Sequence, residues 1–271
     1  MCSHVALAVD FGILTPNSAL GQKHLTAINS YGLLVSVNGL QRGRNMVQIR
    51  PTRAPALGDQ LAEALREQIV RRHLVPGTHL VEDTLAAEYD VSRGPVRDAL
   101  RQLESQGLVE SRRRGYFVVG LTKDDIDDLY ELRESIESLA VKKALEKATS
   151  KQKALGRKIV QEMIKYADRS APADFADADM RFHALLFKMG GNRRLQDVWE
   201  AYEPVFASLI QLTVEEDLDL HPSALDHERL LDLIEEGDLG KLRAELQIHL
   251  DGARRRMAHA VQALIEEGEE P

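Results

Sequence analysis

Hydrophobic residues recur every three or four positions along most of the chain, from Leu57 onward. Positions with this spacing share one face of a helix, so the period predicts helices with an apolar side. In the first half we expect three, over residues 57–74, 81–89 and 92–106. A proline-glycine pair separates the first two, and Gly107 ends the third. The next residues, LVESRRRGYFVVG, predict two short strands around a basic turn, which completes the layout of a winged helix-turn-helix.

The second half of the chain keeps the helical period throughout and shows no strand pattern. Thr122 and Asp125 form a capping-box sequence at the start of its first helix. The expected helices cover residues 122–148, 150–168, 174–189, 192–213, 223–236 and 238–266. Short connections favour antiparallel neighbours. The predicted fold class is therefore mainly α, with an N-terminal winged helix-turn-helix followed by an antiparallel all-helical bundle.

The first 45 residues show no sustained period of either kind and carry few charges. We interpret residues 1–50 as an extension that is disordered, or that is wrongly assigned to the protein, with Met46 as the true start. A small folded cap is the competing interpretation. Two domains are expected after it, at 51–120 and 121–266.

Composition is that of an ordinary globular protein, with 44% hydrophobic residues in 271. The single cysteine, Cys2, allows no intrachain disulfide, which fits the cytoplasm. No apolar run approaches the roughly 20 residues that span a bilayer, so no membrane association is expected. The net charge of −8 is uneven: residues 46–120 carry 11 basic and 10 acidic side chains, whereas 121–271 carry 21 and 32. Nucleic acid is therefore an unsuitable partner for the second half, and any contact in the first half must come from local arginine clusters.

The helix over residues 92–106 has two distinct faces. Its apolar residues form one stripe, whereas Arg93, Arg97 and Arg101 are spaced by four on another face. A guanidinium near the start of such a helix matches the O6 and N7 acceptors of guanine in the major groove. Ser92 and the free amides of the first turn can take a phosphate, and Arg113 at the hairpin tip can follow the backbone. The alternative is a solvated arginine face that nearby acids offset.

Four residues of the second half are candidates for a metal site. Asp179 and His183 lie four apart, one turn from each other on the same helix face. His227 and His249 lie on two later predicted helices. The four side chains could converge on one ion. The alternative is that each histidine is an ordinary structural residue, and that Asp179 and His183 form a simple polar pair.

The first half resembles the winged helix-turn-helix of GntR-family bacterial regulators across PGTHLVEDTLAAEYDVSRGPVRDALRQLESQGLVESRRRGYFVV. The resemblance implies base or phosphate contacts from Arg93 and Arg97, with Gly115 at the wing tip. It also implies a protein that binds operator DNA as a homodimer, because one winged domain reads only a short half-site. One departure is Asp83, which stands where some members carry a backbone-binding arginine.

The second half resembles the FadR C-terminal domain (FCD) class of that family in LYELRESIE, DMRFHALLFKMGGN, DHERLLDLIEEGD and LQIHL. The resemblance implies that Asp179, His183, His227 and His249 bind a divalent metal. Imidazole and carboxylate ligands suit Zn, with Ni or Mn as alternatives. A small organic or sugar acid would then bind the metal, with Arg133 and Asn192 as further effector contacts. An ion pair with Glu137, four residues on, is the rival role for Arg133.

These observations predict a metabolite-responsive transcription regulator rather than an enzyme. A metal-dependent helical enzyme is one alternative, although His227-Glu228 lacks the second histidine of the HExxH zinc-protease motif. A regulator with a purely structural metal is the other.

Overall fold

The computed structural model describes residues 25–28, 34–37, 56–215, 217 and 219–267. The chain divides into two compact units after Ala56. In the first part, strand β1 (Leu25–Ile28) pairs antiparallel with β2 (Leu34–Val37). These two segments lie within residues 1–50, for which the sequence showed no period, because four-residue strands are too short to show one. The rest of the interpretation of that extension, Met46 included, lies outside the described residues.

The winged helix-turn-helix contains three helices and a small sheet. Its elements are α1 (Leu57–Val70), β3 (His79–Leu80), α2 (Glu82–Glu88), α3 (Arg93–Ser105), β4 (Val109–Arg112) and β5 (Gly115–Val118). The expected hairpin is β4 and β5, with Arg112 opposite Gly115. A third strand was not predicted: β3 pairs with the free edge of β5, giving the order β3-β5-β4. Two residues are too few for alternation to reveal a strand.

The apolar stripe of α3 faces the interior, as its spacing predicted. Val96, Ala99, Leu100 and Leu103 are buried. The helix packs against α1, where a Cβ at Gly58 would lie only 3.3 Å from the backbone oxygen of Pro95. The lack of a side chain at Gly58 therefore allows α1 and the start of α3 to approach closely.

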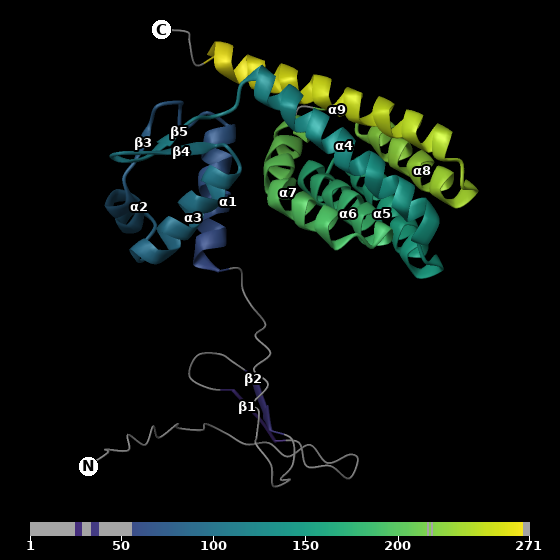
Figure 1. Cartoon of the computed structure of the whole chain (residues 1–271), viewed down its shortest axis with the longest axis horizontal. Coiled ribbons are helices and arrows are strands. Elements are labelled where there is room, and N and C mark those ends of the chain that lie inside the picture. Colours follow the sequence, from purple (N-terminus) through teal and green to yellow (C-terminus); the bar gives the residue numbers. More distant parts are fainter. Residues whose placement is uncertain (1–24, 29–33, 38–55, 216, 218, 268–271) are drawn as a thin grey trace. The chain divides into compact units, whose positions relative to one another are not determined.

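Six helices form the second half, and Figure 1 shows α4 and α9 running beside each other over the others. Their bounds are α4 (Lys123–Lys147), α5 (Ser150–Asp168), α6 (Pro172–Gly190), α7 (Arg193–Val214), α8 (His221–Glu236) and α9 (Leu239–Glu267). Thr122 makes the expected capping box with Asp125. Helix α6 begins two residues before its predicted start, because a proline is tolerated in the first turn of a helix.

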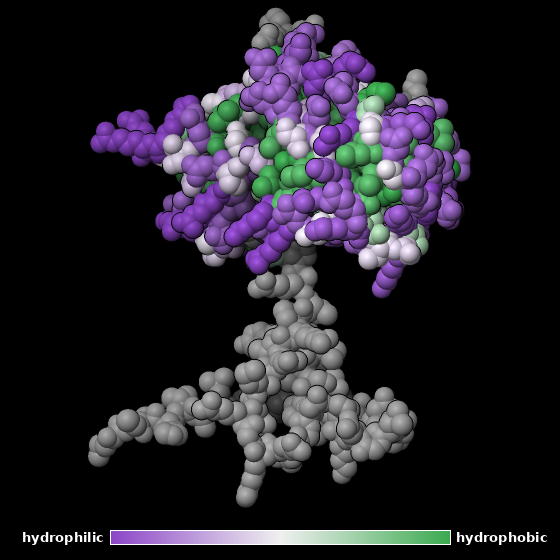
Figure 2. All heavy atoms as spheres, turned by 45° about the vertical axis from the view of Figure 1, so that its right-hand side comes forward, coloured by the Kyte–Doolittle hydropathy of each residue, from purple (hydrophilic) through white to green (hydrophobic). Residues whose placement is uncertain are grey.

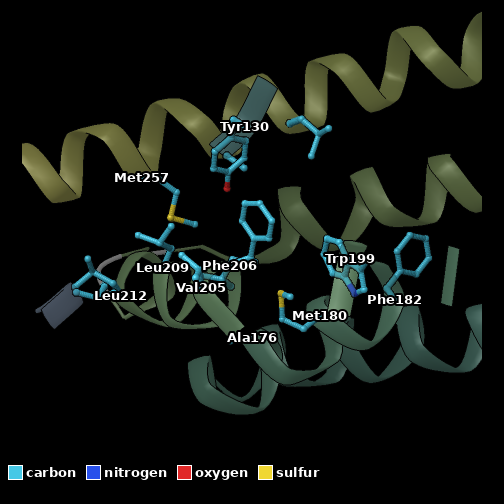
Figure 3. Packing of buried hydrophobic residues seen from close by; sticks show 14 of the residues in the cluster. Tyr130, Ala176, Met180, Phe182, Trp199, Val205, Phe206, Leu209, Leu212 and Met257 are labelled. Atoms are coloured by element: carbon cyan, nitrogen blue, oxygen red, sulfur yellow. The ribbon is translucent and has the colours of Figure 1, made fainter. Parts of the chain in front are cut away.

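Aromatic residues from three helices fill the bundle interior. Figure 3 shows Tyr130 of α4, Phe182 of α6, and Trp199 and Phe206 of α7 pointing into the space between the helices. Trp199 stacks on Phe206 with ring centroids 5.8 Å apart. The face of the molecule in Figure 2 is mostly hydrophilic, with a smaller apolar area at its centre. No helix in the described part of the chain is long and apolar enough to cross a membrane.

Because α6 packs closely on α4, we expect a larger side chain at Gly190 to destabilise the fold. A Cβ there would lie 3.1 Å from Lys143 Cβ and 3.3 Å from the backbone oxygen of Ala140. Gly190→Val should lower the free energy of unfolding by about 1–3 kcal/mol, because overpacking forces the helices apart. Gly252→Val is the matched control, since a Cβ there meets only the flexible end of Arg256. Urea denaturation of both variants measures the difference, and equal stabilities would contradict the packing argument.

Candidate functional site

The proposed DNA-reading side chains lie together on the outer face of α3. Arg93, Arg97 and Arg101 are exposed, and Ser92 is the N-cap residue. The Ser92 side chain makes no capping hydrogen bond. Its hydroxyl is therefore not committed to the helix and can face a phosphate.

The wing brings two more candidates close together. Arg113 is exposed in the turn between β4 and β5. Gly115 has φ of +125°, and a Cβ there would lie 2.9 Å from the His79 ring. Glycine is thus required at this position both by the backbone conformation and by the space available. Its place is the first residue of β5, directly after the turn.

Three histidines from three helices meet at one buried point. The Nε2 atom of His183 on α6 lies 3.3 Å from Nε2 of His227 on α8 and 3.4 Å from Nε2 of His249 on α9. Two nitrogens held about 2.0–2.1 Å from a tetrahedral zinc are roughly 3.4 Å apart, so both distances match the separation that shared ligation requires. All three side chains are buried.

Asp179 supplies a carboxylate at the same point. Its Oδ1 lies 3.1 Å from Nε2 of His227, and its Oδ2 lies 3.8 Å from Nε2 of His183. Oδ2 is buried and has no hydrogen-bond partner among the described residues. A buried carboxylate oxygen without a partner is costly, and a cation is the partner that would satisfy it. The ligand atoms of the three histidines lie within 4.8 Å of one another, and the Asp179 carboxylate lies beside two of them. These ligand types suit a divalent metal.

The other nitrogen of each histidine faces an oxygen. Nδ1 of His183 lies 2.8 Å from Oε2 of Glu137, and Nδ1 of His227 lies 2.7 Å from the backbone oxygen of Ser223. Nδ1 of His249 lies 3.9 Å from Asp226. In neutral His183 and His227, the close acceptor favours the tautomer with the proton on Nδ1, which leaves the Nε2 lone pair available to a metal. Such outer contacts orient histidine ligands in metal sites generally.

Protonation in this cluster is governed by burial and by two carboxylates. Burial lowers the pKa of His183, and burial together with the neighbouring histidines lowers that of His249 to about 4. Burial opposes charge on His227 as well, but Asp179 outweighs it and raises the pKa. Glu137 keeps a pKa of about 2, because His183 and Arg133 overcome the cost of its burial. Two histidines are thus neutral at pH 7, as metal ligation requires.

Arg133 makes the ion pair that was considered as its rival role. Its Nε donates to Oε1 of Glu137 over 2.7 Å, with both side chains fully buried. The guanidinium carbon lies 5.1 Å from the centre of the Phe206 ring, and Tyr130 and Trp199 are also near. Its Nη2, however, is buried with no hydrogen-bond partner in the described part of the molecule. The ion pair therefore leaves one donor of Arg133 unused.

A narrow cavity of about 20 Å³ lies beside the histidines. Arg133, Asp179 and His249 line it, so the buried arginine and two of the four candidate ligands border the same small space. The sequence did not indicate Arg256 and Asp217, which also line it. Asn192 does not line it: its side chain caps α7 by accepting from the backbone N–H of Leu195. Contact between Asn192 and an effector stays a prediction, and in this structure the side chain is held at the helix end.

Comparison with known proteins identifies the family. The model of bacterial regulatory proteins of the gntR family matches residues 57–119, and the FCD domain model matches 128–252. Over 176 residues the chain is 32% identical to the gluconate operon transcriptional repressor of Bacillus subtilis. The matched region covers 65% of this chain and 71% of the repressor. The chain belongs to the GntR family and carries an FCD domain.

Further relatives of this GntR-family protein are also described as regulators. The Nta operon transcriptional regulator of Aminobacter aminovorans is 35% identical over 127 residues, covering 46% of this chain and 60% of the relative. The solved structure of Escherichia coli McbR/YncC superposes with a TM-score of 0.58 at 19% identity, covering 80% of this chain and all of that one. The structure of a GntR regulator from Rhodococcus sp. RHA1 superposes with a TM-score of 0.56 at 22% sequence identity. The match covers 75% of this chain and 98% of that one. The two structures bear on the fold alone.

Glu137 connects Arg133 to the candidate metal centre and is the residue that best tests it. Glu137→Gln keeps the size of the side chain but removes the charge that holds both Arg133 and His183. Metal affinity should fall by about 10–100-fold, as for other outer partners of histidine ligands. Zinc binding measured by competition with a chromogenic chelator checks this. Glu134→Gln, on the same helix but without a contact to the cluster, is the control, and equal affinities in both variants would contradict the role of Glu137.

Proposed function

We propose that this protein is a metabolite-responsive transcription regulator that binds operator DNA as a homodimer through α3 and the wing. A divalent metal held by Asp179, His183, His227 and His249 would anchor a small carboxylate effector in the FCD domain. The observation that carries the proposal is a cavity lined by Arg133 together with two of the four candidate ligands, Asp179 and His249. One nitrogen of that buried arginine has no hydrogen-bond partner among the described residues. Zn is the first candidate because three imidazoles and a carboxylate suit it, with Ni and Mn as alternatives.

The charges of the buried cluster favour an anionic effector. Arg133 carries +1, whereas Glu137 and Asp179 each carry −1, so the cluster totals −1 when its histidines are neutral. A divalent ion changes this total to +1. A buried net charge is unfavourable, and one carboxylate would cancel it. That carboxylate could also accept from Nη2 of Arg133.

The residues at the cavity also restrict the class of the effector. Arg256 adds a second cation, and Asp217 adds a carboxylate that would accept hydrogen bonds from hydroxyl groups. A hydroxylated carboxylic acid satisfies both. The relative named above is a repressor of the gluconate operon, and gluconate is a sugar acid of this chemistry. A cavity of about 20 Å³ is too small for such a molecule, so its walls must move on binding.

One ion pair offers a route from the cavity to the DNA-binding domain. Val214 lines the cavity at the end of α7, and the next residue, Glu215, binds Arg71 after α1. Nη2 of Arg71 donates to both carboxylate oxygens, over 2.8 and 3.0 Å. Movement of the wall around an effector would strain or break this pair. Effector binding would then change the placement of the two winged domains in the dimer.

A regulator with a purely structural metal is the second candidate. The small size of the cavity favours it, because a filled core needs no effector. The relatives found are transcriptional regulators rather than enzymes, so the enzyme alternative has no comparable support.

DNA recognition is expected to depend on the exposed arginines of α3. Arg93→Ala should cost about 1–3 kcal/mol of operator binding if its guanidinium reads a guanine. The double variant with Arg97→Ala should lose sequence preference while keeping its melting temperature, because neither side chain is buried. Fluorescence anisotropy on an operator obtained by selection measures both effects. Unchanged affinity of the double variant would show that another surface contacts the bases.

The full proposal is tested by removing two ligands and screening for the effector. His227→Ala with His249→Ala should abolish the bound metal in elemental analysis and remove the metal-dependent rise in melting temperature. DNA binding should survive, because the two substituted histidines lie on α8 and α9, outside the winged helix-turn-helix. In the metal-loaded wild type, at least one organic or sugar acid should raise the melting temperature and alter operator affinity, and the double variant should not respond. Metal binding without any response to acids would favour the structural-metal candidate, and absence of metal after reconstitution would reject the site.

A further inference from the structure

A hydrogen bond connects the DNA-reading helix to the helix before it. Nε of Arg97 on α3 donates to Oε2 of Glu82, the first residue of α2, over 2.8 Å. The Arg97 side chain remains 53% exposed, whereas that of Glu82 is only 31% exposed. The acid therefore lies partly against the protein, and the arginine extends outward beyond it.

The atom that Glu82 holds decides which edge of Arg97 remains available. A guanidinium can bind two acceptors through its two terminal nitrogens, or through Nε and one terminal nitrogen. Because Nε is occupied by Glu82, only the terminal pair is free. Guanine presents its O6 and N7 acceptors side by side in the major groove, and this terminal pair matches them. Holding Nε also removes rotational freedom before DNA is met, which lowers the entropic cost of binding.

The neighbouring ion pair, between Arg93 and Asp83, is more exposed than the pair of Arg97 and Glu82. Nε of Arg93 lies 2.5 Å from Oδ1 of Asp83, but the two side chains are 60% and 63% exposed. An ion pair in that position is screened by water and contributes little to the orientation of either side chain. The positioning role is therefore assigned to Glu82 and not to Asp83.

We propose that Glu82 is a positioning residue that sets the sequence preference of Arg97 by holding its Nε and directing its terminal nitrogens at a base. The inference rests on the proposed function, in which α3 reads operator DNA. Two other roles for Glu82 must be separated from it. As an acid in the first turn of α2, it interacts favourably with the helix dipole, and as a negative charge near DNA it weakens binding to any sequence.

A pair of variants separates these roles. Glu82→Gln and Glu82→Met both remove the charge and keep the length of the side chain, so effects on the helix dipole and on general DNA repulsion are the same in both. Only glutamine keeps an oxygen that can accept from Nε of Arg97. Any difference between the two variants therefore reports the hydrogen bond. Glu88→Gln, an exposed acid on the same helix, controls for loss of charge alone.

The experiment uses the full-length protein and a pool of DNA duplexes with a randomised window. Selection with the wild type gives its preferred sequence, and selection with Arg97→Ala identifies the base pair at which preference depends on Arg97. Affinities are then measured by anisotropy for duplexes that differ only at that base pair. We expect Glu82→Met to lose roughly tenfold in discrimination there, as expected for loss of one bidentate contact. Glu82→Gln and Glu88→Gln should discriminate like the wild type, and both Glu82 variants should bind mixed-sequence DNA more tightly.

Two results would overturn the inference: full discrimination in Glu82→Met, or equal loss in Glu82→Gln and Glu82→Met. If Glu82→Met fails to fold in a thermal melt, Glu82→Ala makes the same comparison. A wild type that enriches no sequence would reject DNA reading by α3 itself, which is a failure of the proposed function. A selected sequence with no base pair dependent on Arg97 would overturn this inference alone.

Discussion

The burial of charge inside the helical bundle is the constraint on which the rest of the second domain depends. Arg133, Glu137 and Asp179 lie in a core otherwise built from aromatic and aliphatic side chains. Ionised groups in such surroundings are tolerated only where each has a close partner. Glu137 provides this for Arg133 and for His183 at once. Four helices, α4, α6, α8 and α9, must therefore keep their relative placement for the cluster to remain satisfied.

The cluster is nearly but not fully satisfied by protein atoms. One oxygen of Asp179 and one nitrogen of Arg133 lack partners among the described residues, and both residues line the same cavity. The first atom requires a cation or a proton donor, and the second requires an acceptor. A metal ion and an anion together would meet both needs. Under the proposed function, the arrangement that makes the core costly would also favour a metal with a bound acid.

In the winged domain the arginines of α3 are exposed to water, in contrast to the buried charges of the bundle. Arg93 and Arg97 are exposed, and each has an acid from α2 as a neighbour. In water such pairs contribute little to stability. The proposed consequence of the Arg97–Glu82 pair lies in which donor atoms of Arg97 are free for DNA. The near-neutral charge of residues 46–120 has a local explanation here, since acids next to the reading helix offset its arginines.

The sequence by itself determined the helices of the regulator and the arginine face of α3, and it named four candidate metal ligands, of which the structure brings three histidines together. All of these follow from spacing along one helix or from ordered motifs, which neighbours in the chain define. Only the tertiary structure decided the contacts between helices. Glu137 contacts His183, 46 positions away in the sequence, and the Ser223 carbonyl orients His227. Glu82 accepts a hydrogen bond from Arg97, 15 positions away. Asn192 caps a helix rather than lining the cavity, and β3 adds a strand to the wing. Such contacts depend on how each helix is rotated against its neighbours, and packing of the whole core sets that rotation.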